Sequence, residues 1–133
     1  MYRIILFFSF ILCTALSAQS QLEELGRFGE TGAAPGQFKD PVAIDLTANG
    51  QLYICDRGNQ RIQVFDLNGN FLMNFGGFGW QNETFDNPVD IWARSTINIY
   101  VADYNNQRVQ RFDKDFHYLS SKYSNPGAQE KFQ

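Results

Sequence analysis

Two short sets of residues in this sequence have types and spacing that could do chemistry. A carboxylate beside an amide supplies the oxygen ligands that divalent cations use, and an arginine beside a carboxylate forms strong charge-assisted hydrogen bonds. The first set therefore suggests either a cation site or an ion-paired turn, and the second set repeats it 47 residues later. The two sets are Asp56, Asn59 and Arg61, and then Asp103, Asn106 and Arg108.

The repetition of this set favours a structural role over a chemical one. A catalytic or binding constellation is normally unique, whereas a set that is present once in each repeat more often solves a folding problem. We interpret all six residues as a structural turn motif, in which the aspartate accepts backbone N–H groups and the arginine satisfies carbonyl groups or the same carboxylate. A divalent-cation site is the alternative, but one such turn offers fewer than the roughly six oxygen ligands that a hard cation needs.

The 47-residue register extends far beyond the motif. Without any gap, Phe38 falls on Phe85 and Pro41 falls on Pro88, and a third partial copy places Phe132 on Phe85. So many matched aromatic, glycine and proline positions indicate an internal repeat.

Each copy predicts four short strands, because apolar and polar residues alternate between turn signals. In the first copy we expect strands over 41–46, 51–56, 61–66 and 70–76. The connectors at 48–50, 57–60 and 67–69 are rich in glycine and asparagine, which we expect to supply positive φ angles. No stretch after the first 18 residues has a convincing helical period.

Four antiparallel strands in about 47 residues are typical of a β-propeller blade. The segment "DPVAIDLTANGQLYICDRGNQRIQVFDLNGNFLMNFG" also resembles an NHL repeat, in the proline that opens the inner strand, the apolar strand that ends in Asp, and the Asn-x-Arg of the third strand. The copy "NPVDIWARSTINIYVADYNNQRVQRFD" is similar. The resemblance implies a six-bladed propeller. We therefore expect an all-β fold of four-stranded antiparallel blades that is incomplete in this chain.

The expected organisation has five parts. Two blades cannot close a ring, so we expect that the chain is a fragment of a longer propeller or that a partner completes it. The parts are a signal peptide (1–18), an outer strand that leads into the propeller (19–29), repeat 1 (30–76), repeat 2 (77–123) and the start of a truncated third repeat (124–133).

The first 18 residues are typical of a secretory signal peptide. Arg3 precedes an apolar run from Ile4 to Leu12, and small residues follow as far as Ala18, near which we expect cleavage. An uncleaved membrane anchor is the alternative, but the run is shorter than the roughly 20 residues that a spanning helix needs. Leu12 precedes Cys13 where a lipoprotein would need a small residue. We expect a secreted or periplasmic protein with no membrane span after cleavage.

Composition and motifs argue against several functions. Without Arg3 the chain has 10 Lys and Arg residues against 14 Asp and Glu residues, which does not favour nucleic-acid binding. His117 is the only histidine, so a histidine metal cluster is absent, and serine-hydrolase, P-loop and dinucleotide motifs are missing. We expect no catalytic residue, cofactor or metal on this chain. The alternative is a fragment of an extracytoplasmic propeller enzyme, similar to an amidating lyase or a hydrolase, whose catalytic residues lie in missing blades.

Cys55 is the only cysteine after the expected signal peptide, so it cannot form an internal disulfide there. It lies in an apolar strand, where Ala102 is its counterpart in the second copy. We expect a small buried core residue. A catalytic thiol is the alternative, and it would need a nearby base such as His117.

Residues that differ between the copies are the candidates for ligand binding. Strand reversal places the inter-blade loops (about 30–40 and 77–87) at the same end as the turns at 57–60 and 104–107. We expect this loop face to bind a protein or a glycan, because large rigid side chains bury area at low entropic cost. Its candidate residues are Arg57, Trp80, Asn82, Tyr104 and Asn105.

Two further points concern these differences. Trp80 could instead fold into the groove between the blades, and Asn82-Glu83-Thr84 is a glycosylation acceptor if the source is eukaryotic.

On the inner strand of the second repeat, Asp90, Trp92 and Arg94 are expected to line the central channel or its mouth. The alternative there is that Asp90 and Arg94 simply pair with each other.

Overall fold

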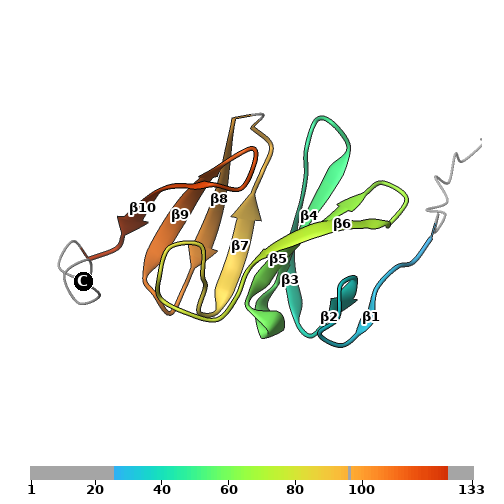
Figure 1. Ribbon diagram of the computed structural model, residues 1–133, viewed down its shortest axis with the longest axis horizontal. Coiled ribbons are helices and arrows are strands. Elements are labelled where there is room, and N and C mark those ends of the chain that lie inside the picture. Colours follow the sequence, from blue (N-terminus) through green and yellow to red (C-terminus); the bar gives the residue numbers. More distant parts are fainter. Residues whose placement is uncertain (1–25, 96, 126–133) are drawn as a thin grey trace, which may run out of the picture.

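The computed structural model describes residues 26–95 and 97–125, and these residues form two four-stranded antiparallel sheets that stand side by side (Figure 1). Each sheet follows chain order from its inner to its outer strand, which confirms the predicted fold class. Blade 1 consists of β3 (Pro41–Leu46), β4 (Gln51–Asp56), β5 (Arg61–Asp66) and β6 (Phe71–Gly76). Blade 2 consists of β7 (Pro88–Trp92), β8 (Asn98–Asp103), β9 (Arg108–Asp113) and β10 (Tyr118–Tyr123).

Short elements precede each blade. The two-residue strands β1 (Glu30–Thr31) and β2 (Gln37–Phe38) pair in parallel before blade 1, and a single parallel bridge joins Phe78 to Phe85 before blade 2. The expected outer strand over 19–29 lies partly outside the described residues. Its described part, residues 26–29, is not in a strand, because the described chain offers no preceding third strand with which it could pair.

The turn between β4 and β5 corrects the expected source of its positive φ angle. It is a single 3-10 turn, η1 (Arg57–Asn59), and the left-handed residue is Gln60, with φ of 56°, followed in the second copy by Gln107 with φ of 52°. Gly58 is not left-handed. A Cβ atom there would lie 2.8 Å from Lys39 Cγ, so glycine is needed for the close approach of the inter-blade loop.

The hydrophobic core lies between the two blades. Alternation along each strand turns one face of blade 1 toward blade 2, and the facing side chains form one cluster. Blade 1 contributes Tyr53, Cys55, Ile62 and Val64. Blade 2 and the loop before it contribute Phe85, Ile91, Ala93, Ile99, Val101 and Phe112.

Each blade therefore has a second face that the other blade does not cover. On blade 1 this free face carries Ile44, which is 61% exposed, and Leu46, which is 50% exposed. The free face of blade 2 corresponds in the repeat register to the face of blade 1 that blade 2 covers. It is more polar than that covered face, because Asp90 and Arg111 stand where blade 1 has Ala43 and Val64. No helix within the described ranges 26–95 and 97–125 is long and apolar enough to cross a membrane.

Candidate functional site

The predicted turn motif of blade 1 joins η1 to the loop before β3. Oδ1 of Asp56 accepts the backbone N–H groups of Lys39 and Asp40, at 3.0 and 3.4 Å. Its Oδ2 accepts hydrogen bonds from Nδ2 of Asn59 at 2.7 Å and from Nε of Arg61 at 3.1 Å. The motif thus joins the inter-blade loop to the turn, whereas the sequence interpretation expected contacts within the turn only.

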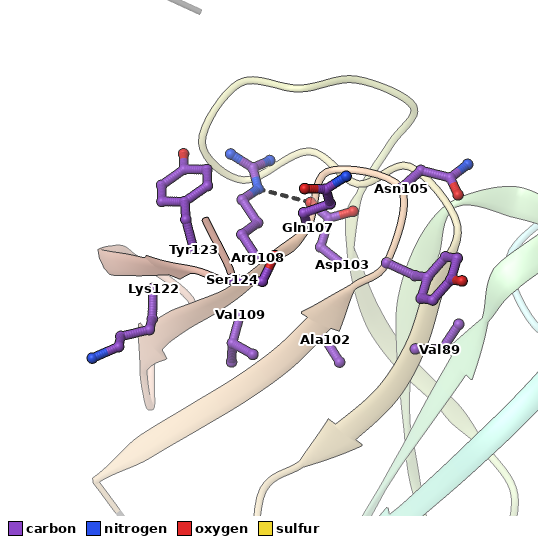
Figure 2. Close-up of a pocket in the computed structure, with 11 residues that line it drawn as sticks. Val89, Ala102, Asp103, Asn105, Gln107, Arg108, Val109, Lys122, Tyr123 and Ser124 are labelled. Carbon is purple, nitrogen blue, oxygen red and sulfur yellow. Dashed lines mark hydrogen bonds and ion pairs between the residues drawn. The ribbon is translucent and has the colours of Figure 1, made fainter. Parts of the chain in front are cut away.

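Blade 2 repeats this arrangement at the other copy of the motif. Nε of Arg108 donates to Oδ2 of Asp103 at 2.8 Å (Figure 2). Nδ2 of Asn106 donates to the same oxygen at 2.9 Å. The guanidinium of Arg108 also donates to the carbonyl oxygens of Gln81 and Thr84, at 2.7 and 3.0 Å. Asp103 is fully buried and the Arg108 side chain is 2% exposed, so the ion pair is shielded from water.

The sequence interpretation missed one member of the motif. Gln63 is fully buried; its Nε2 donates to the Gln37 carbonyl oxygen at 2.7 Å, and its Oε1 accepts the Gly36 N–H at 3.0 Å. Gln110 makes the corresponding bonds to Thr84 and Glu83. The signal was present, because these two glutamines also lie 47 residues apart.

The geometry leaves no space for a cation at Asp56. Besides the four donors above, Nε2 of Gln63 lies 3.3 Å from Oδ2, so five donors surround a carboxylate that has about four lone-pair positions. Among the residues that the structure describes, no group of three or more His, Cys, Asp or Glu side chains is placed to hold a metal ion.

The structure brings the predicted loop-face segments together at one end of the blades. Nδ2 of Asn105 donates to Oδ1 of Asp86 at 2.9 Å, which ties the turn 104–107 to the loop 77–87. Arg57 pairs with Asp40 at 2.7 Å and ties η1 to the loop 30–40. Tyr104 is 67% exposed and Asn82 is also exposed.

Trp80 lies on the surface of this loop face. Its side chain is 54% exposed, and Phe78 beside it is 71% exposed. The groove between the blades is filled instead by Phe85, which is fully buried and packs against Phe75 and Phe112. The two exposed rings are therefore available to a ligand.

Asp90 and Arg94 do not pair with each other, so this alternative is wrong. Nε of Arg94 donates to Oδ1 of Asp45 in blade 1 at 2.9 Å, while Oδ1 of Asp90 accepts the N–H of its neighbour Ile91. Asp45 is the better partner because it is buried beside the backbone of Ala93, so the arginine neutralises a shielded charge.

Asp90 and Trp92 lie on the free face of blade 2. Their cross-strand partners on this face are Ala102 and Tyr100, and the rings of Trp92 and Tyr100 are 5.6 Å apart. The described blades do not enclose a channel, so a channel-lining role for these residues stays a prediction.

Cys55 is fully buried, and its Sγ donates to the Pro88 carbonyl oxygen at 3.3 Å. Burial, with the nearby charge of Asp56, raises the pKa of the thiol to about 12, so it is not a thiolate at neutral pH. His117 is exposed and pairs with Asp113 at 3.1 Å in the turn after β9. In the 47-residue register His117 corresponds to Asn70, whose Nδ2 donates to Asp66 in the hairpin of blade 1.

A cavity of about 790 Å³ opens next to the motif of blade 2 (Figure 2). Ala102 and Val109 form its apolar floor, and Arg108 and Lys122 stand at its edge. Sequence reasoning missed this cavity, because its lining residues lie on four different strands and come together only in the folded sheet.

Comparison with known proteins decides what kind of repeat this is. The NHL repeat family model matches residues 38–65, which run from the end of β2 to β5. These residues are an NHL repeat. The 47-residue register extends the same motif contacts to blade 2, so the two sheets are blades of an incomplete NHL-type propeller.

Similar proteins carry the same repeat. Protein brain tumor of Drosophila melanogaster is 40% identical over 50 residues, which are 38% of this chain and 5% of that protein. NHL repeat-containing protein 3 of Homo sapiens is 47% identical over 38 residues, 29% of this chain and 11% of that protein. The chain thus matches only a small part of either relative's length.

The fold is shared with solved propellers. A streptogramin B lyase structure covers 74% of this chain, which in turn covers 30% of that chain, with a TM-score of 0.53 and 13% identity. This likeness concerns the fold alone.

Proposed function

We propose that this chain is part of an exported NHL-repeat propeller that binds a protein through its loop face and performs no chemistry itself. The observation that carries the proposal is the pair of exposed aromatic side chains, Trp80 and Tyr104, on loops that partly buried hydrogen bonds hold in place. A rigid aromatic side chain in such a position contributes binding energy at low entropic cost.

The loop face is held in place by the motif beneath it. Nδ2 of Asn106 donates to the Gly79 carbonyl oxygen at 2.8 Å, directly before Trp80. Oδ1 of Asp103 accepts the Asp86 N–H at 2.8 Å, so both ends of the loop 77–87 are tied to the same turn. The exposed rings therefore need little ordering when a partner binds.

The binding test uses the purified chain with two variants. Wild type, the double variant Trp80→Ala/Tyr104→Ala and the control Leu67→Ala are immobilised, and extracellular fluid from the source organism is passed over each. Leu67 is 65% exposed and lies between β5 and β6. This hairpin is at the end of blade 1 opposite η1 (Figure 1). We expect a defined protein, identified by mass spectrometry, on wild type and on the control, with the signal lost on the double variant.

Each other outcome is informative. Equal capture on all three proteins contradicts the loop-face proposal. Binding to a glycan array that the double variant loses, with no protein captured, identifies a glycan as the ligand instead. Export is tested separately by N-terminal sequencing of the secreted chain, which we expect to begin near Gln19; retention of residues 1–18 in the cell-associated form contradicts it.

A further inference from the structure

The triplet Asn82-Glu83-Thr84 is the part of the loop 77–87 that the proposed binding function leaves unexplained. It is the only Asn-x-Ser/Thr triplet in the 133 residues of the chain. In exported eukaryotic proteins this triplet accepts N-linked glycans, and it lies on the surface there because the glycan is bulky. The geometry of the loop shows whether Asn82 is placed to carry such a group.

Asn82 lies in a tight turn whose backbone is held on both sides. The Thr84 N–H donates to the Gln81 carbonyl oxygen at 3.3 Å and closes the turn. Nη2 of Arg108 donates to the same carbonyl oxygen at 2.7 Å. Oε1 of Gln110 accepts the N–H of the residue after Asn82 at 3.1 Å. The turn is therefore fixed to β9 without any contribution from the Asn82 side chain.

The Asn82 side chain is exposed, and in the described part of the chain it makes no hydrogen bond or ion pair. The asparagines of the neighbouring turn are engaged instead. Nδ2 of Asn106 donates to the Gly79 carbonyl oxygen at 2.8 Å, and Nδ2 of Asn105 donates to Oδ1 of Asp86 at 2.9 Å. A bulky group on Nδ2 of Asn105 or Asn106 would disrupt these contacts, whereas a group on Asn82 disrupts none.

We propose that Asn82 is an N-glycosylation site that is modified during export. The acceptor is Nδ2 of Asn82 and the donor is a lipid-diphosphate oligosaccharide. A bond forms between Nδ2 and the anomeric carbon of the first sugar, the bond from that carbon to the phosphate oxygen breaks, the lipid diphosphate leaves, and the amide releases one proton. This proposal rests on the export proposed above and on a eukaryotic source, which the similar animal proteins support.

The folded loop indicates when the transfer takes place. Oγ1 of Thr84 donates to the Gln81 carbonyl oxygen at 2.8 Å, and a Cβ atom at Gly79 would lie 2.8 Å from Oγ1. The hydroxyl group of the triplet is thus packed inside the folded loop. The transfer therefore precedes folding of the loop, and the exposed Asn82 then keeps the glycan in solvent.

The glycan and the proposed protein partner use different parts of the loop. The two ends of the loop are tied to the turn 104–107, whereas its tip reaches the far end of blade 2. There Oε1 of Glu83 accepts the N–H of Tyr118, the first residue of β10, at 3.3 Å. A glycan on the tip therefore lies beside the outer strands and leaves Tyr104 uncovered.

The first test translates the full chain in the presence of endoplasmic-reticulum microsomes. We expect the wild-type chain to gain a mobility shift that a peptide N-glycosidase removes, and we expect Asn82→Gln and Thr84→Ala to lose the shift completely. Thr84→Ser keeps the hydroxyl group and should keep the shift. The matched control Asn105→Gln, at an exposed asparagine outside the triplet, should also keep it. Resistance to added protease measures export independently of the glycan.

The second test examines the chain from the extracellular fluid of the source organism. Trypsin releases peptide 62–94, which is treated with the glycosidase in water labelled with heavy oxygen. The enzyme converts a glycosylated asparagine to aspartate, so we expect the label at position 82 alone. The asparagines outside the triplet in the same peptide are internal controls: Asn68, Asn70, Asn74 and Asn87.

The outcomes separate the glycosylation site from export. A chain that is protected from protease but carries no shift overturns the site, and so does an unlabelled Asn82 in the extracellular chain. An unprotected chain contradicts export instead. Residues 1–18 are then replaced by the signal peptide of a known secreted protein, and a missing shift in that chain overturns the site.

A thiol-labelling measurement checks that the folded loop accommodates the glycan. Cys55 is fully buried, so it should be as slow to react in the glycosylated chain as in Asn82→Gln. Fast labelling of Cys55 in the glycosylated chain alone would mean that the glycan disrupts the fold, and this result also overturns the proposal.

Discussion

Asp45 of β3 and Arg94, two residues after β7, form an ion pair that joins the two blades, with 2.9 Å between Oδ1 and Nε. The other oxygen of Asp45 accepts the Ala93 N–H at 2.7 Å, so one carboxylate holds the start of the β7–β8 hairpin of the next blade. In the second repeat Trp92 takes the place of Asp45. Blade 2 therefore lacks this carboxylate on its free face, and the contact is specific to the junction between the two described blades.

We expect Asp45→Ala to lower the free energy of unfolding by about 1–3 kcal/mol, because the buried Ala93 N–H would lose its acceptor. Arg94→Ala should cost less than about 1 kcal/mol, because this side chain is 73% exposed and its charge is solvated without the partner. Urea unfolding of both variants beside wild type measures the difference. Equal losses would show that the ion pair, and not the backbone contact, holds the junction.

The same carboxylate gives a prediction about pH. Burial raises the pKa of Asp45, but the hydrogen bonds from Ala93, Arg94 and Leu46 outweigh it, and the pKa lies below the ordinary value of 3.8. A group with a depressed folded-state pKa stabilises the fold above its unfolded-state pKa and loses that contribution as the pH falls through its folded-state pKa. The stability difference between wild type and Asp45→Asn should stay constant from neutral pH to about pH 5 and shrink below 3.8. If the stability difference between the two proteins grows on acidification instead, the pKa of Asp45 is not lowered in the folded state.

The strands were predictable because their signals are local. Val42 and Ile44 alternate with Ala43 and Asp45, and Asn68-Gly69 marks a turn, so periodicity alone places β3 to β6 within a residue. The repeat then transfers these bounds to blade 2. Gln63 and Gln110 could have been added to the motif by the same register.

The partner of Arg94 was not predictable in this way. Asp90 is close to it in sequence, whereas Asp45 is 49 residues away and meets it only when the faces of two blades pack together. The exposure of Trp80 has a similar cause. A glycine-rich loop that carries Phe78, Trp80 and Phe85 does not reveal which ring enters the groove until the Gly77–Phe85 hydrogen bond is known.

Phe85 should be the most costly aromatic residue of the loop 77–87 to remove. It is fully buried, and its ring centroid lies 6.2 Å from that of Phe75 and 6.1 Å from that of Phe112. Phe85→Ala is expected to lose about 3–5 kcal/mol of unfolding free energy, because it leaves a cavity between the blades. Phe78→Ala, a matched change at a 71% exposed position of the same loop, should stay within about 0.5 kcal/mol of wild type. Similar values for the two variants in urea unfolding would mean that the groove is not the core.

Arg108 should not tolerate lysine. Its guanidinium contacts Asp103 and the carbonyl oxygens of Gln81 and Thr84 at the same time, and a lysine ammonium cannot reproduce that planar arrangement. Arg108→Lys is expected to cost about 1–3 kcal/mol by urea unfolding, because buried acceptors lose their donor. Arg57→Lys is the control, since its pair with Asp40 is partly exposed and should change stability by less than about 1 kcal/mol. If both substitutions prove neutral, the buried motif does not hold the loop.

Cys55 offers a probe of how the two blades separate. Its thiol is fully buried under Pro88 and its pKa is raised to about 12, so in the folded state it should not react with a thiol reagent at mildly alkaline pH. In a Cys13→Ser background we expect labelling only through opening of the blade junction. The factor by which Asp45→Ala speeds labelling should then match the factor that corresponds to its loss of unfolding free energy. Arg94→Ala should change the labelling rate little. A labelling rate that is the same in wild type and Asp45→Ala would show that the thiol is reached by a local path, without separation of β3 from β7.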